Sequence, residues 1–234
     1  MVKLTPKAKR KKRKHIAADL STREGRARAR REMVWQDHGF LRAIYQNLHQ
    51  ISPDMYRSNQ PSPAKVMKYA RELGLQTILN LRGESTKGYY LLEKEACEQA
   101  GITLIDFQVF SRDTPTREAI FAARDLFETI EYPALMHCKS GADRAGLMSA
   151  LYVLIVEKRP VREAAAQLAW KYGHVKQAKT GLLDAFFAAY APFEDKGMAF
   201  FDWVDNIYDP DELTRNFQAK GWAVRLTDSI LHRE

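Results

Sequence analysis

The sequence predicts an α/β protein with a central, mostly parallel sheet that carries helices on both faces. Two observations support this fold class. Between residues 52 and 157, short apolar stretches alternate with segments of helical periodicity, and the connections between them are short. Glycines stand where several of the helical segments should end. With 234 residues, of which 45% are hydrophobic and 28% charged, the chain has the size and balance of one globular domain.

The first half of this pattern begins with a short extended stretch at 55–57. Ser62 and Pro63 then form a helix start, with a capping side chain before a first-turn proline. Gly74 is expected to end that helix. A buried strand at 76–81 and a helix at 88–100 follow.

The second half repeats the alternation. A strand is predicted at 102–109, and Thr114-Pro115 is read as the start of the next helix. A short strand at 133–137 precedes a helix at 142–157 that is apolar nearly all round. Beyond residue 176, aromatic clusters predict further helices packed on the domain: Phe186-Phe187, Phe200-Phe201, Trp203, Phe217 and Trp222.

Parallel strands with right-handed crossovers place their carboxyl ends along one edge of the sheet, where ligands bind in open α/β folds. Arg82, the 110–114 loop and the 137–144 loop each follow a predicted strand. We therefore expect them to converge on one site.

The net charge of +8 is unevenly distributed. Residues 1–31 contain 13 Lys and Arg and two acidic residues, which gives +11, so the remaining chain carries −3. We expect this basic tail to be disordered or partly helical, and to contact an anionic membrane surface or nucleic acid. The apolar residues of 33–48 are expected to dock on the body of the protein.

Two cysteines are too few for a disulfide scaffold or a four-thiolate zinc site, which favours a reducing cytoplasm. No segment has the 18 or more apolar residues of a membrane span, and the N-terminus lacks the apolar region of a secretory signal. We expect a cytoplasmic protein that the basic tail can hold at a membrane.

The 137–144 loop carries the most specific chemistry. Cys138 and Arg144 are separated by five residues in a strand-to-helix connection. Such a connection supplies backbone N–H groups and the positive end of a helix dipole, which together bind a phosphate dianion and favour a thiolate. Gly141 permits the tight turn, and the planar guanidinium of Arg144 can hold two phosphate oxygens. A thiolate held against a phosphate predicts attack on phosphorus and a cysteinyl-phosphate intermediate.

This His-Cys-x5-Arg motif resembles the signature of the cysteine-dependent protein tyrosine and dual-specificity phosphatases, bacterial members in particular. Three other patches agree with the resemblance in the expected order: 56–61 (YRSNQP), 80–84 (NLRGE) and 171–174 (KYGH). The resemblance covers about residues 52–175. Together with the charge boundary, it predicts a basic tail at 1–31 and one phosphatase domain at 32–234, with its core at 52–175 and a helical extension at 176–234.

The resemblance implies a hydrolase that needs neither metal nor cofactor, with Cys138 as nucleophile. The phosphate-binding loop implied is Lys139, Ser140, Gly141, Ala142, Asp143 and Arg144. The family usually has Ser or Thr after the arginine, where the hydroxyl helps the sulfur to leave. This chain has Ala145, which predicts slow breakdown of the phosphoenzyme.

Three aspartates compete for the role of general acid. Asp113 lies in a loop at the ligand edge, and the resemblance also places the acid in this loop, so it is favoured. Asp106 lies inside a predicted strand but is 32 residues before Cys138, a spacing common in dual-specificity phosphatases. Asp143 lies within the loop itself, as in myotubularin-type lipid phosphatases, or else stabilises the helix dipole.

Protein phosphotyrosine is the leading substrate class. Phosphoinositides or inositol phosphates are the alternative, because lipid-directed relatives also carry a lysine at the position of Lys139. A rhodanese-like sulfurtransferase and a phosphate-binding pseudophosphatase are the rivals from other classes. His137 is expected to brace the loop, Arg57 and Arg82 to bind phosphate or hold loops, and Trp170 to pack in the core.

Overall fold

The computed structural model describes residues 16–176 and 180–218, and a five-stranded sheet lies at the centre of this part of the chain. The strands lie in the order β1-β2-β5-β3-β4; β1 is antiparallel to β2 and the other neighbours are parallel. Their bounds are β1 (His49–Ser52), β2 (Met55–Asn59), β3 (Thr77–Asn80), β4 (Thr103–Asp106) and β5 (Ala134–Cys138).

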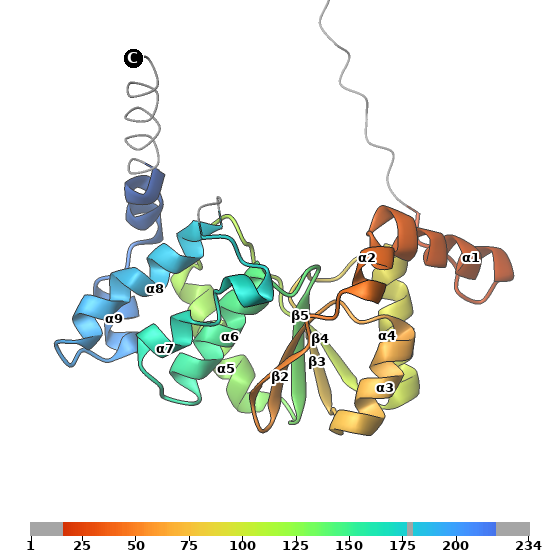
Figure 1. Cartoon of the computed structure of the whole chain (residues 1–234), viewed down its shortest axis with the longest axis horizontal. Helices are drawn as coiled ribbons and strands as arrows, with labels where there is room; N and C mark the ends of the chain where they lie inside the picture. The colour runs from red at the N-terminus through yellow and green to blue at the C-terminus, as the bar shows by residue number, and fades with distance from the viewer. Residues whose placement is uncertain (1–15, 177–179, 219–234) are drawn as a thin grey trace, which may run out of the picture.

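Helices cover both faces of the sheet, which confirms the predicted fold class (Figure 1). One face carries α3 (Pro63–Leu73) and α4 (Gly88–Ala100). The other face carries α5 (Arg117–Thr129) and α6 (Asp143–Ile155), then α7 (Val161–Ala165), the 3-10 turn η2 (Trp170–Tyr172), α8 (Gly181–Glu194) and α9 (Phe200–Asn206). None of the helices in the described residues is long and apolar enough to cross a membrane.

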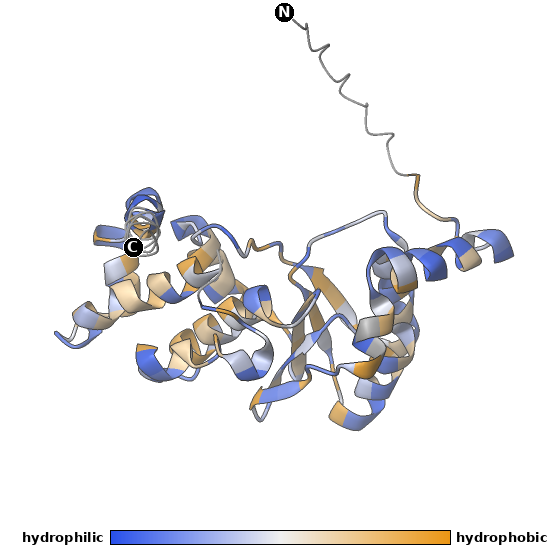
Figure 2. Cartoon of the chain, turned by 45° about the horizontal axis from the view of Figure 1, so that its top comes forward, coloured by the Kyte–Doolittle hydropathy of each residue, from blue (hydrophilic) through white to orange (hydrophobic). Residues whose placement is uncertain are grey.

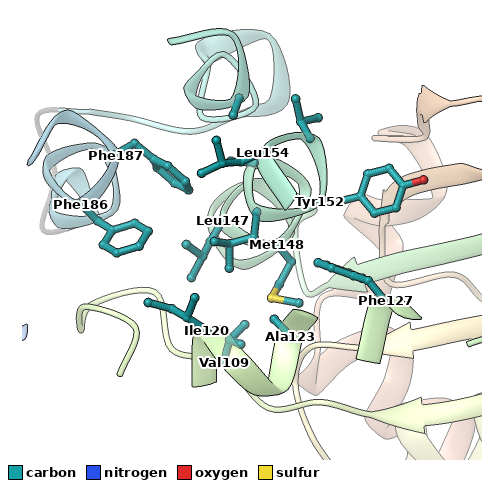
Figure 3. Close-up of a cluster of buried hydrophobic side chains, with 14 of the residues drawn as sticks. Val109, Ile120, Ala123, Phe127, Leu147, Met148, Tyr152, Leu154, Phe186 and Phe187 are labelled. Atoms are coloured by element: carbon teal, nitrogen blue, oxygen red, sulfur yellow. The ribbon is translucent and has the colours of Figure 1, made fainter. Parts of the chain in front are cut away.

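Helix α6 follows the strand β5 and lies at the centre of the larger hydrophobic core. Leu147, Met148 and Tyr152 face α5 and the sheet, while Phe186 and Phe187 of α8 close the core from the other side (Figure 3). This burial on every side explains why the helix is apolar nearly all round, as the sequence predicts. It also fixes the N-terminus of α6 at the carboxyl edge of the sheet.

Several of the predicted helix ends are confirmed at the residues that the sequence indicates. The side chain of Ser62 accepts a hydrogen bond from the Lys65 amide and caps α3. Gly74 and Gly101 end α3 and α4 in the left-handed region, with φ of 64° and 69°. The start of α5 differs: Thr116 caps it, because the Thr114 hydroxyl bonds instead to the carbonyl of Pro210.

The N-terminal segment forms α1 (Arg23–Arg31), the π-helical turn η1 (Glu32–Gln36) and α2 (Gly39–Ile44) beside α4 (Figure 1). Although α1 is strongly hydrophilic (Figure 2), Ala29 is fully buried and Arg26 pairs with Glu95 of α4 at 2.7 Å. The charge boundary at residue 31 therefore falls inside continuous helical structure. The first 15 residues of the expected tail, and Trp222, lie outside the described residues.

The apolar residues of 33–48 dock only in part, because Met33 and Leu48 pack against buried clusters while others do not. Trp35 is 68% exposed and Ile44 is 88% exposed. The expectation that Trp170 packs in the core is also wrong, because its side chain is 78% exposed. Within the short turn η2 it is Tyr172 that takes the buried position.

Candidate active site

The 138–144 loop connects the end of β5 to the first turn of α6, as the sequence predicts. Cys138 is buried, and the amide of Gly141 donates to its Sγ at 3.2 Å. Gly141 has a φ of 76°, and a Cβ there would lie 2.6 Å from the amide nitrogen of Asn59. Only glycine fits this turn, so the loop wraps closely over the end of β2.

The carbonyl groups of the loop are held from outside by two buried side chains. Arg57 donates to the carbonyls of Gly141 at 2.7 Å and Ala142 at 3.1 Å. Asn47 donates to the carbonyl of Ser140 at 2.9 Å. Because peptide N–H and C=O groups point in opposite directions, fixing three successive carbonyls outward turns the N–H groups of the loop toward its interior. Together with the α6 N-terminus, they form an anion-binding concavity.

Arg57 is itself fixed from several sides. It also donates to the carbonyl of Gln167 at 2.7 Å and lies over the ring of Tyr172, 3.9 Å from its centroid. Burial lowers the pKa of Arg57 to about 10, so the guanidinium is charged at neutral pH. The sequence left two roles open for Arg57, binding phosphate or holding a loop. Its hydrogen bonds to the loop carbonyls support the second role.

A buried pair lies on the α4 side of the loop. The Nε2 atom of His137 is 2.9 Å from a carboxylate oxygen of Glu93, and both side chains are fully buried. The other oxygen of Glu93 accepts from the Gln60 amide at 2.7 Å. This contact joins β5 to α4, but neither ring nitrogen of His137 makes a hydrogen bond within the described residues, so the hydrogen-bonded bracing expected from the sequence is not found.

Arg144 is the second residue of α6 and is half-buried. Within the described residues it has no acidic partner and no hydrogen bond, so its guanidinium is available to a ligand. Lys139 differs: its ammonium is 3.6 Å from Asp37 and 3.3 Å from Nδ1 of His38.

Asp37 forms ion pairs with three cationic side chains at the edge of the loop. Arg42 and Arg82 each reach its carboxylate at 2.7 Å, and Lys139 is the third. Burial alone would raise the pKa of Asp37, but the hydrogen-bonded guanidinium of Arg82, with the charges of Arg42 and Lys139, holds it below its usual range. Arg82 lies at the predicted edge, yet it binds Asp37 and stacks on the Tyr89 ring.

The favoured acid, Asp113, lies exposed in the loop between β4 and α5 and makes no hydrogen bond within the described residues. Asp106 was expected to lie deep inside a strand, but it is the exposed last residue of β4. Its carboxylate accepts from Asn80 at 2.7 Å and from the Tyr90 hydroxyl at 2.6 Å. Asp106 is thus committed to two donors, whereas Asp113 is free.

Asp143 and Asp184 bind the two nitrogens of the His174 ring, one carboxylate on each side. The Asp143 carboxylate is 2.8 Å from Nδ1 of His174, and Asp184 of α8 is 2.7 Å from Nε2 of the same ring. Burial alone would lower the pKa of His174, but the bonds to Asp143 and Asp184 raise it to about 9. At neutral pH His174 is therefore a cation, hydrogen-bonded to Asp143 and Asp184.

Sequence reasoning did not find Asp37, Asn47, Glu93 or Asp184. Asn47 and Glu93 act through partners distant in the chain, and the shorter separations of Asp184 from His174 and of Asp37 from Arg42 match no known spacing, so spacing gives no local signal. The second cysteine, Cys97, is buried on α4, and burial together with Glu93 and Glu98 raises its pKa to about 12. A thiol with this pKa is inert at neutral pH.

Comparison with known proteins agrees with this geometry. Residues 46–182 match the family model described as "DSP-PTPase phosphatase fused to NAD+ Kinase". Over 112 residues the chain is 28% identical to the dual specificity protein phosphatase TpbA of Pseudomonas aeruginosa, in each of two strains. That match covers 47% of this chain and 48% of the relative, so the chain spans about half the length of the curated relatives it matches.

The crystal structure of P. aeruginosa TpbA shares the fold. It superposes with a TM-score of 0.51 at 21% sequence identity, over 73% of this chain and 90% of that one.

Proposed function

Because this chain belongs to the family of dual-specificity-type phosphatase domains described as fused to NAD+ kinase, we propose that it hydrolyses phosphomonoesters through a cysteinyl-phosphate intermediate. The observation that carries the proposal is the outward fixing of three loop carbonyls by Arg57 and Asn47. It leaves the loop amides and the unpaired Arg144 to bind a phosphate dianion next to Cys138.

In the first step, the Cys138 thiolate attacks phosphorus and the ester P–O bond breaks. Arg144 and the amides of 139–144 hold the other phosphate oxygens and the charge that develops on them. Asp113 gives its proton to the leaving oxygen. The exposure of Asp113 and its lack of hydrogen bonds support this role, since the acid must approach a bound substrate.

In the second step, water attacks phosphorus, the S–P bond breaks and the thiolate returns. The Asp113 carboxylate accepts the proton of the water, and inorganic phosphate leaves. The residue after Arg144 is Ala145, which is fully buried in the first turn of α6. Because alanine has no hydroxyl, this position cannot help the sulfur to leave. We expect this step to limit turnover.

Protein phosphotyrosine is the proposed substrate, since TpbA, the curated relative, is a dual specificity protein phosphatase. Inositol phosphates are less favoured, because the lysine that suggested them, Lys139, is engaged by Asp37.

The test is a turnover panel of phosphotyrosine and phosphoserine peptides, phosphoinositides and inositol phosphates. Cys138→Ser serves as the blank, and EDTA is present throughout. The proposal is supported if the wild type releases phosphate from the phosphotyrosine peptide and Cys138→Ser does not. Peptide binding without release indicates a pseudophosphatase, and sulfur transfer from thiosulfate indicates a sulfurtransferase.

A further inference from the structure

Exposed apolar side chains gather around the proposed active site. Ten large hydrophobic side chains are exposed in the described residues, and seven of them belong to segments that flank the 138–144 loop. These seven are Trp35, Phe40, Ile44, Tyr45, Phe110, Trp170 and Val175. We call the surface formed by residues 30–45, 108–113 and 169–176 the docking face.

Each of the three segments is tied to the loop or to its edge of the sheet. The first contains Asp37, which is 3.6 Å from Lys139, and continues into Asn47, which bonds to Ser140. The second follows the carboxyl end of β4, parallel to β3 and β5. The third contains His174, which bonds to Asp143. The docking face therefore consists of segments that contact the loop or follow a strand at the same edge of the sheet.

The charges of the docking face are almost all basic. Its exposed charged side chains are Arg30, Arg31, Arg112, Lys171, Lys176 and one acid, Asp113. The 15 residues that precede the described part of the chain add eight Lys and Arg and no acid. Bulky apolar side chains mixed with Lys and Arg are typical of surfaces that lie at the boundary between lipid headgroups and acyl chains.

An apolar cavity of about 470 Å³ opens beside this surface. It is lined mainly by Met33, Val34, Phe40, Pro61 and Tyr89, with Arg42 among its polar groups. Arg42 pairs with the carboxylate that also faces Lys139. A ligand with an apolar chain in the cavity therefore finds a cation, Arg42, in the cavity wall to face an anionic end.

We propose that the docking face binds an anionic lipid bilayer, and that the cavity takes one acyl chain of an anionic phospholipid. Nucleic acid fits less well, because Ile44 at 88% exposure and an apolar cavity offer nothing to a phosphodiester backbone. Docking would place the mouth of the site at the headgroup level. The inference goes beyond the proposed hydrolysis and does not depend on it.

The first test is cosedimentation of the full chain with vesicles of phosphatidylcholine, with or without phosphatidylserine. We expect binding to the mixed vesicles only, and at least a tenfold loss of affinity in the double variant Trp35→Ser, Ile44→Ser. The matched control is Val156→Ser, Ile207→Ser, which removes two exposed apolar side chains away from the docking face and should bind as the wild type does. All variants should hydrolyse a small soluble phosphomonoester equally.

The second test addresses the cavity. Calorimetry with monomeric short-chain phosphatidylserine should show binding by the wild type and none by Ala64→Phe, which fills the cavity that Ala64 lines. The docking proposal would be overturned if the double variant Trp35→Ser, Ile44→Ser binds vesicles as the wild type does, or if the wild type does not bind them. Duplex DNA binding that the same substitution abolishes, without vesicle binding, would assign the face to nucleic acid instead. Unchanged lipid binding by Ala64→Phe would refute the role of the cavity.

Discussion

The clearest quantitative prediction concerns His174, which lies between two carboxylates. In the folded protein its pKa is about 9, against an ordinary value of 6.5, and its side chain is 1% exposed. A difference of about 2.5 pH units corresponds to about 3 kcal/mol, at roughly 1.4 kcal/mol per unit. Two charge-assisted hydrogen bonds to Asp143 and Asp184 account for a stabilisation of this size.

The sign follows from proton binding. Between pH 6.5 and about 9 the folded state holds a proton on His174 that the unfolded state has lost. This contribution to stability is therefore complete below pH 6.5 and is lost as the pH rises through about 9. His174→Gln removes it, so the variant should be less stable by up to about 3 kcal/mol at pH 6 and should approach the wild type near pH 10.

Urea denaturation of both proteins at a series of pH values measures this difference. If His174→Gln loses stability with rising pH as steeply as the wild type does, the assignment of the charged imidazole is wrong.

Three further predictions concern catalysis. Arg57→Lys keeps the charge but cannot hold both carbonyls, so kcat/KM should fall about 10- to 100-fold while near-UV circular dichroism shows a folded protein. Asp113→Asn should slow hydrolysis of phenyl phosphate about 100-fold and that of p-nitrophenyl phosphate much less, because only phenolate, the poorer leaving group, needs the proton. Asp106→Asn should slow neither reaction to this extent. Ala145→Ser should shorten the lifetime of the phosphoenzyme, seen as a smaller burst in stopped-flow traces at low pH, and an unchanged burst would count against a role for the missing hydroxyl.

The fold could be predicted where local chemistry decides the backbone. Gly74 and Gly101 end their helices because the left-handed conformation costs glycine little. The alternation of strands and helices set the positions of β3 and β5, and with them the loop that carries Cys138. The strand β1 was not predicted, because four residues with mixed burial show no alternation.

The supporting residues of the site could not be predicted for a different reason. Arg57 and Gln167 are 110 residues apart in the chain, and Asp37 and Lys139 are 102 apart, so only the folded sheet brings them together. Helical periodicity likewise identified an apolar segment at 33–48. It could not tell whether Trp35 and Ile44 face the protein or the solvent.

Rapid chemical quench with a ³²P-labelled phosphotyrosine peptide measures whether Cys138 carries the phosphoryl group during turnover. We expect the wild type to carry covalently bound label during turnover and peptide mapping to place it on Cys138. Cys138→Ser should neither bind label covalently nor release phosphate. Release of phosphate by Cys138→Ser at the wild-type rate, or turnover of the wild type with label on another residue, would contradict this expectation.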